Sequence, residues 1–119
     1  MAEDKKTHGD KVVITCALTG VLASRKQNGA IPYTPAEIAD EAKRAYDAGA
    51  SVVHIHARTP EGGPTFEPKV FAEIKKEIRA RCPIILNFST GTIIDDVSQQ
   101  IAYLKESRPE IGAAHLGGQ

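Results

Sequence analysis

Short apolar runs that alternate with amphipathic stretches constrain the fold of this 119-residue chain more than any other feature. Three runs, residues 11–18, 51–57 and 83–88, have the length and β-branched composition of buried strands, and residues 111–116 form a weaker fourth. The stretches between them carry apolar residues at helical spacing. Continuous apolar strands that alternate with such helices indicate a parallel sheet covered by helices. We therefore expect an α/β fold with right-handed crossovers.

Three helices are predicted between these strands. The first has the clearest signals, because Thr34 is placed as its N-cap, a proline follows, and Glu37 completes a capping box. Gly49 stands where a residue in the left-handed conformation ends a helix, and Asp95 or Asp96 can cap the third helix. The apolar stripes expected to face the core are Ile38, Ala42, Ala45 and Tyr46, then Val70, Phe71, Ile74 and Ile78, then Ile94, Val97, Ile101 and Leu104.

Two layouts of the sheet fit this order, an open doubly wound sheet and a (β/α)8 barrel. The dinucleotide-binding signature GxGxxG of the open sheet is absent after the first strand, where the chain reads Ala-Leu-Thr-Gly. Polar residues instead collect where strands end: Thr19 after the first, His54 and His56 at the end of the second, and Ser89 at the end of the third. Functional groups gather at this rim in barrels, so the pattern favours a barrel.

The length limits how much of a barrel the chain can form. A (β/α)8 barrel usually needs about 250 residues, whereas this chain supplies about four strands and three helices. We expect the N-terminal part of a TIM barrel with parallel strands, in which a polar tail at residues 1–10 precedes an incomplete barrel domain at residues 11–119. We interpret the chain as the N-terminal part of a longer enzyme.

Charge and cysteine content exclude several classes of function. The 15 basic and 15 acidic side chains balance, so no net field attracts nucleic acid or an anionic membrane. No apolar run approaches the roughly 20 residues of a membrane span, and the polar start lacks the apolar core of a signal peptide. Two cysteines are too few for a disulfide framework. We expect a cytoplasmic protein.

His54 and His56 are the strongest candidates for a functional site. On a strand they point to the same side, with Cα atoms about 6.6 Å apart, so that both imidazoles can reach one metal ion. Catalytic zinc usually takes three protein ligands and a water molecule, so a third ligand is still required. The alternative is that both histidines are core residues whose ring nitrogens bond to other protein groups.

The segment Ser89-Thr90-Gly91-Thr92 is a candidate substrate-binding loop. It follows the third strand and leads into a helix, so its hydroxyl and backbone N–H groups could bind an anionic group near a helix N-terminus. An ordinary turn followed by a helix cap explains the same residues. The long loop at residues 19–33 lies at the same rim, where loops of this length are often functional.

Five motifs in order make the chain resemble the β-keto acid cleavage enzymes. They are Val-Ile-Thr-x-Ala-Leu-Thr-Gly at residues 13–20, Tyr-Thr-Pro-Ala-Glu-Ile-Ala at 33–39, Ala-Gly-Ala-Ser-Val-Val-His-Ile-His-Ala-Arg at 48–58, Gly-Gly-Pro at 62–64 and Asn-Phe-Ser-Thr-Gly at 87–91. The resemblance implies a zinc-dependent (β/α)8 barrel that condenses a 3-keto acid with acetyl-CoA and releases acetoacetate and an acyl-CoA. It also implies that His54 and His56 bind Zn2+ and that Ser89 contacts the keto acid. A complete enzyme of this kind is expected to be a homo-oligomer.

The chain also departs from the family pattern. The third zinc ligand, a glutamate, the aspartate that acts as base and an assisting arginine come later than residue 119 in the family. We therefore expect the isolated chain to be inactive. Four positions differ from the residues that are usual in the family: Leu22 replaces a glutamate, Thr92 a glycine, Ala113 a threonine, and His115 a polar residue such as asparagine. The sequence therefore does not predict which side chain the keto acid substrate carries. Two other functions stay open as well: an amidohydrolase-like metal hydrolase, and an inactive truncated paralogue that acts as a binding partner.

Overall fold

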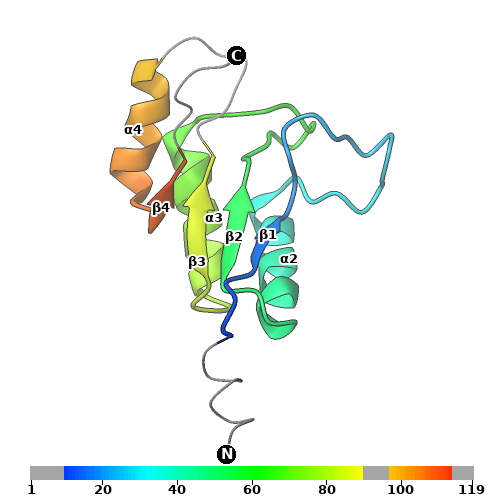
Figure 1. The fold of residues 1–119 in the computed structure, drawn as a ribbon. Coiled ribbons are helices and arrows are strands. Elements are labelled where there is room, and N and C mark those ends of the chain that lie inside the picture. Colours follow the sequence, from blue (N-terminus) through cyan, green and yellow to red (C-terminus); the bar gives the residue numbers. More distant parts are fainter. Residues whose placement is uncertain (1–9, 90–96, 114–119) are drawn as a thin grey trace, which may run out of the picture.

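The computed structural model describes residues 10–89 and 97–113 of the chain. Within them, strands and helices alternate strictly (Figure 1). The elements in chain order are β1 (Thr15–Ala17), α2 (Pro35–Asp47), β2 (Val52–Ile55), α3 (Pro68–Arg79), β3 (Ile85–Phe88), α4 (Val97–Ser107) and β4 (Ile111–Gly112). The α/β fold with four parallel strands and three helices that the sequence predicts is confirmed.

The strands lie side by side in the order in which they occur in the chain. The sheet has the order β1-β2-β3-β4, and every pair is parallel. In the view of Figure 1, α2 and α3 lie behind the sheet, and α3 contacts both α2 and α4. A doubly wound sheet would reverse its strand order and carry helices on both faces. Sequential order with helices on one face is the arrangement of successive strands in a (β/α)8 barrel.

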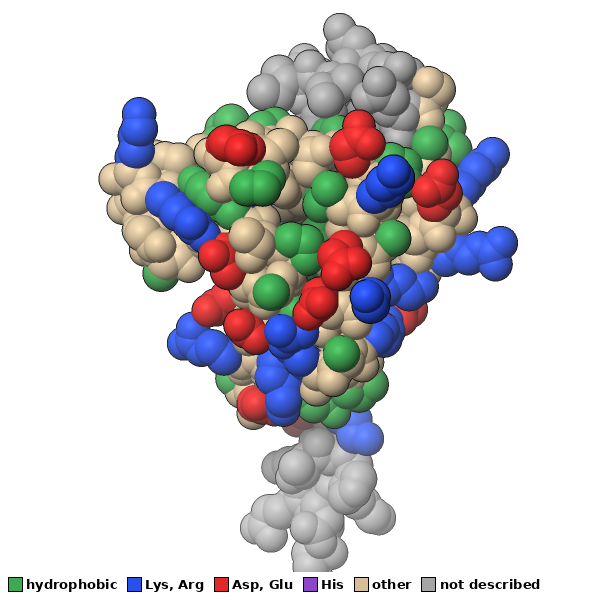
Figure 2. Space-filling model, turned by 180° about the vertical axis from the view of Figure 1, so that it is seen from behind, with side chains coloured by type: hydrophobic (Ala, Val, Ile, Leu, Met, Phe, Trp, Pro, Cys, Tyr) green, Lys and Arg blue, Asp and Glu red, His purple; other side chains and the backbone are tan. Residues whose placement is uncertain are grey.

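The core lies between the sheet and the helices. Strand β2 contributes Val53 and Ile55, and β3 contributes Leu86 and Phe88, all of them fully buried. On each strand these are alternate positions, so they share the face of the sheet that packs against the helices. The helices contribute Ile38, Ala42, Phe71, Ile74, Ile78 and Tyr103. Figure 2 shows the side of the molecule opposite to that of Figure 1, where acidic and basic side chains intermingle.

The start of α2 follows its sequence signals closely. The Thr34 hydroxyl accepts a hydrogen bond from the Glu37 N–H (3.2 Å), and the Glu37 carboxylate accepts from the N–H groups of Thr34 (3.1 Å) and Tyr33 (2.8 Å). These backbone donors, with the nearby Arg25 cation, lower the pKa of Glu37. Gly49 follows the helix with φ +112°. The predicted capping box and the predicted left-handed glycine are therefore both confirmed.

Strand β1 is shorter than the sequence predicts. The apolar run covers residues 11–18, but the strand spans only Thr15–Ala17, and the side chains of Val12 and Val13 are 78% and 71% exposed. Among the described residues β1 pairs only with β2, so its other edge has no neighbouring strand. An apolar, β-branched run therefore indicates the strand but not the residues at which pairing begins.

The buried face of α4 differs from the prediction. Ile101, which the sequence places on the apolar stripe, is 45% exposed, so this prediction is wrong. The helix instead buries Tyr103 and Ser107, and the Tyr103 ring stacks on Phe71 of α3 with 4.0 Å between ring centroids. The larger aromatic surface contacts the neighbouring helix. Ile94, Asp95, Asp96 and the side chain of Val97 lie outside the described part. No helix among the described residues is long and apolar enough to cross a membrane.

Candidate metal and substrate site

The two histidines converge at the carboxyl end of β2. His54 lies within the strand and His56 lies one residue beyond its last residue, Ile55. Their Nε2 atoms are 3.2 Å apart, and the ring planes cross at 77°. Both side chains are half-buried. The prediction that both rings point to the same side is therefore confirmed.

The spacing of the two ring nitrogens fits a shared metal ion. Two imidazole ligands at the 2.0–2.1 Å bond length of zinc, set at a tetrahedral angle, hold their nitrogen atoms about 3.3–3.4 Å apart. The observed 3.2 Å separation between Nε2 of His54 and Nε2 of His56 is close to this value. The same distance suits an N–H···N hydrogen bond between one neutral ring and the other. No group of three or more histidine, cysteine, aspartate or glutamate side chains that could hold a metal occurs among residues 10–89 and 97–113.

Asn87 lies beside the histidine pair. It occupies the position of β3 that is in register with His54, and so shares its face of the sheet. Its Oδ1 atom is buried and accepts no hydrogen bond from the described part of the protein. Leaving such an acceptor unpaired costs about 1–3 kcal/mol. The face that carries the histidines thus also presents a buried acceptor that a bound donor could use.

Ser89 lies at the same rim, directly after β3. It is 3% exposed. Its N–H group donates to the Ile55 carbonyl (3.0 Å), and its own carbonyl accepts from the hydroxyl of Tyr103. Burial raises the pKa of that phenol well above its usual range. The backbone of Ser89 is therefore fixed by β2 on one side and α4 on the other. The other residues of the predicted substrate loop, Thr90, Gly91 and Thr92, lie outside the described residues.

The Thr19 side chain holds the backbone at His56. Its hydroxyl donates to the His56 carbonyl (3.0 Å) and accepts from the His56 N–H (3.4 Å). One residue earlier, the Leu18 N–H donates to the His54 carbonyl (3.2 Å) as in a parallel ladder. The sequence places Thr19 at the rim but does not predict this contact.

Arg58 is a buried charged residue at this rim for which the sequence predicts no role. Its side chain is 2% exposed, although it carries a charge. The guanidinium donates to the carbonyls of Gly20 (2.6 Å), Gly62 (2.7 Å) and Ala23 (2.9 Å). It therefore joins the loop after β1 to the turn after β2. A cation that directly follows a buried apolar strand is the signal that could have indicated such a role.

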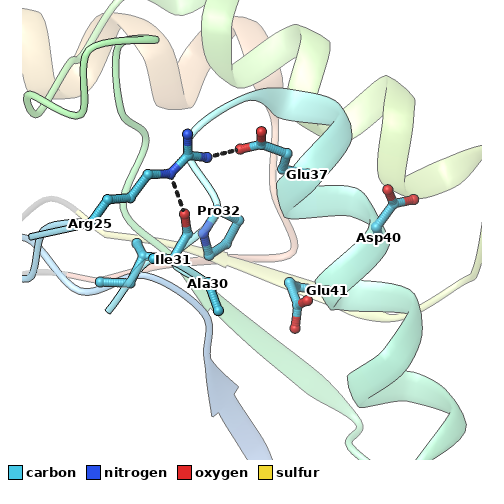
Figure 3. A pocket seen from close by; sticks show the side chains of 8 residues that line it. Arg25, Ala30, Ile31, Pro32, Glu37, Asp40 and Glu41 are labelled. Atoms are coloured by element: carbon cyan, nitrogen blue, oxygen red, sulfur yellow. Dashed lines mark hydrogen bonds and ion pairs between the residues drawn. The ribbon is translucent and has the colours of Figure 1, made fainter. Parts of the chain in front are cut away.

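A second cluster lies on the outer side of the loop after β1. The Arg25 guanidinium lies 4.2 Å from the centre of the Tyr33 ring and pairs with Glu37. Figure 3 shows a pocket here between the loop and α2. Its other acidic side chains, Asp40 and Glu41, pair with Arg81 and Arg44, so each carboxylate already has a cationic partner. The acidic side chains that line the pocket are thus already engaged in ion pairs within the protein.

Comparison with known proteins identifies several relatives. The 3-keto-5-aminohexanoate cleavage enzyme of Fusobacterium nucleatum is 37% identical over 109 residues, which cover 91% of this chain and 40% of the relative. The 3,5-dioxohexanoate:acetyl-CoA acetone transferase of Paraburkholderia graminis is 36% identical over 109 residues, 90% of this chain and 35% of the relative. The 3-oxoadipate:acetyl-CoA acetyltransferase of Cupriavidus necator is 39% identical over 80 residues, 66% of this chain and 28% of the relative.

The chain spans less than half the length of each of these relatives. The match to the beta-keto acid cleavage enzyme family itself extends over residues 11–118, nearly the whole chain. The resemblance carried by the five sequence motifs is therefore confirmed, and the chain belongs to the β-keto acid cleavage enzyme family.

Proposed function

We propose that this chain supplies two metal ligands and part of the substrate site of an enzyme that condenses a 3-keto acid with acetyl-CoA, giving acetoacetate and a new acyl-CoA. The observation that carries the proposal is the convergence of the two Nε2 atoms at 3.2 Å. Family membership supports it, as do the names of relatives that transfer groups to or from acetyl-CoA. The histidines lie on the second strand, which argues against an amidohydrolase-like hydrolase, whose HxH pair ends the first strand.

In this proposal His54 and His56 hold Zn2+ through their Nε2 atoms, which requires both rings to be neutral with the proton on Nδ1. Bound zinc would act as a Lewis acid that polarises the ketone of the substrate. The chain itself supplies rigid placement of the two rings on one face of β2. The third ligand and the catalytic base are expected in the part of the enzyme that follows these motifs in the family, so we expect the 119-residue chain alone to bind zinc weakly and to show no turnover.

Ser89 and the following Thr90–Thr92 segment are proposed to bind the carboxylate of the keto acid through hydroxyl and N–H donors. Removing one hydrogen bond to a charged group costs about 1.5–3 kcal/mol. Ser89→Ala in a complete enzyme that carries this segment should therefore lower kcat/KM by about ten- to a hundredfold. The zinc content should not change. A kcat/KM within twofold of the unsubstituted enzyme would leave Ser89 as a turn residue only.

Zinc titration of the 119-residue chain tests the metal site directly. Competition with a chromogenic chelator gives the stoichiometry and the dissociation constant. We expect one Zn2+ per chain and at least tenfold weaker binding in His54→Ala and in His56→Ala. His8→Ala, in the N-terminal tail, is the matched control and should bind as the wild type does. Equal affinity of the His54→Ala variant and the wild type would refute the proposed site.

A further inference from the structure

Pairing between β1 and β2 stops before the second histidine, because the last registered pair is Ala17 with His54. The ladder of β2 ends at Ile55, so His56 lies beyond it. On the other strand, Gly20 adopts φ +65°, a left-handed conformation that turns the chain away from the strand direction. Side-chain contacts therefore take over the role of the backbone ladder at this point.

The Thr19 hydroxyl provides the first of these contacts. It uses its donor on the His56 carbonyl (3.0 Å) and one of its acceptor sites on the His56 N–H (3.4 Å). Thr19 is 6% exposed, so little water is available to replace either bond. Both peptide groups that flank the His56 Cα atom are thus held by one side chain from the neighbouring strand end.

Arg58 provides the second contact, two residues further along. Its guanidinium donates twice to the Gly20 carbonyl, through Nε (3.1 Å) and Nη2 (2.6 Å). Gly20 directly follows Thr19, so this bond fixes the backbone that carries the threonine hydroxyl. The hydrogen bonds of Thr19 and Arg58 thereby join the segment after β2 to the segment after β1, at His56 and two residues beyond it, where no backbone ladder connects them.

We propose that Thr19 is a positioning residue for the metal ligand His56, an inference that rests on the proposed function. The direction of an imidazole follows from the backbone that carries it. The two bonds from Thr19 fix that backbone and so set the 3.2 Å spacing between the Nε2 atoms of His54 and His56. Groups that orient metal ligands typically change metal affinity by ten- to a hundredfold when they are removed.

The test compares zinc affinity of variants of the 119-residue chain by chelator competition. Thr19→Val replaces the hydroxyl by a methyl group of similar shape and should weaken zinc binding at least tenfold. Thr19→Ser keeps the hydroxyl and should bind within threefold of the wild type. Thr34→Val is the matched control, because it removes a half-buried threonine hydroxyl whose hydrogen bond caps α2 and does not hold the His56 backbone. It should lower the urea midpoint but leave zinc affinity unchanged.

Two results would overturn the inference while leaving the proposed function intact. One is Thr19→Val binding zinc within twofold of the wild type, and the other is Thr34→Val weakening zinc binding as much as Thr19→Val does. If Thr19→Val does not fold, Thr19→Ala, which adds no apolar contact, takes its place. Failure of both to fold would assign the hydroxyl to folding and overturn its role in metal placement. Equal zinc binding by the wild type and His54→Ala would instead refute the proposed function.

Amide hydrogen exchange gives a second readout that needs no metal. In the zinc-free chain, the His56 N–H should exchange at least tenfold faster in Thr19→Val than in the wild type, because its acceptor is lost. The Leu18 N–H, which donates to the His54 carbonyl, should be much less affected. Unchanged exchange at His56 would show that Thr19 does not hold this part of the backbone.

Discussion

Replacement of the buried cation Arg58 tests whether the two rim loops depend on a single side chain. Arg58→Met keeps an unbranched stem of similar volume and removes the guanidinium. Four backbone carbonyls then lose a donor: those of Gly20, Ala23 and Gly62 at 2.6–2.9 Å, and that of Thr19 at 3.5 Å. Because these acceptors are backbone carbonyls, the substitution does not remove them. Each carbonyl is left without its hydrogen bond from Arg58 unless a water molecule replaces the guanidinium.

The size of the effect follows from the contacts with Gly20, Ala23 and Gly62, because the 3.5 Å contact with Thr19 is too long to add much. A hydrogen bond to a charged group contributes about 1.5–3 kcal/mol net. The three residues that accept are partly exposed, so water recovers part of the loss and the lower end of this range applies. We therefore expect Arg58→Met to lower the free energy of unfolding by about 3–5 kcal/mol, a large share of the 5–15 kcal/mol of a typical domain. Arg58→Lys should lose about half as much, since a single ammonium cannot reach carbonyls on two loops.

Urea unfolding monitored by circular dichroism measures this difference from the midpoint at constant slope. Arg44→Met is the matched control, because the Arg44 side chain is 76% exposed and its ion pair is with Glu41 on the same helix. Its loss should stay below about 0.5 kcal/mol. A change within 1 kcal/mol of the wild type for Arg58→Met, at unchanged slope, would refute the reasoning.

Two further predictions concern the same loops. Gly62 has φ +95°, and a Cβ atom there would lie 2.5 Å from the Tyr33 ring, so Gly62→Ala should lower the free energy of unfolding by about 2–4 kcal/mol in urea titrations. Gly29→Ala, with no atom within 4 Å of its Cβ, should stay close to the wild type. The pKa of Glu37 is lowered in the fold, so its contribution to stability is complete above the unfolded value of 4.5 and is lost as the pH falls through the folded value. Urea midpoints of Glu37→Gln measured from about pH 6 to pH 2.5 should therefore vary less with pH than those of the wild type, and equal slopes would contradict this.

The parts of the fold that the sequence predicts well depend on neighbours in the chain. The capping box joins Thr34 to Glu37 within one helical turn, so its residues carry the whole signal. The shared face of His54 and His56 follows from the alternation of a single strand. In both cases the geometry is set before any other element packs against the segment.

The parts that the sequence does not predict depend on distant partners. Arg58 lies 38 residues from Gly20, and no local pattern shows which carbonyls will surround its guanidinium. On α4, both Ile101 and Tyr103 fit a helical apolar stripe, and the position of α3 decides which of them is buried. The start of β1 likewise depends on whether a second strand lies along its free edge.

Two of the candidate site residues, His56 and Ser89, lie at strand ends, and in each case a side chain from another part of the chain holds the backbone. Each lies one residue beyond the end of a strand, where the backbone ladder is incomplete, although the Ser89 N–H still donates to a neighbouring strand, at the Ile55 carbonyl. A residue within the ladder would be rigid but set back from the rim, whereas a residue in a free loop would reach the rim without a fixed direction. Thr19 ties the backbone of His56, and Tyr103 of α4 ties the carbonyl of Ser89.

The hydrogen bonds from Thr19 and from Tyr103 come from different hydroxyl groups, but neither depends on pH near neutrality. A threonine hydroxyl does not titrate, and burial raises the pKa of Tyr103, so its phenol stays protonated and continues to donate at neutral pH. The placement of His56 and Ser89 should therefore not change over the pH range in which imidazoles gain and lose protons.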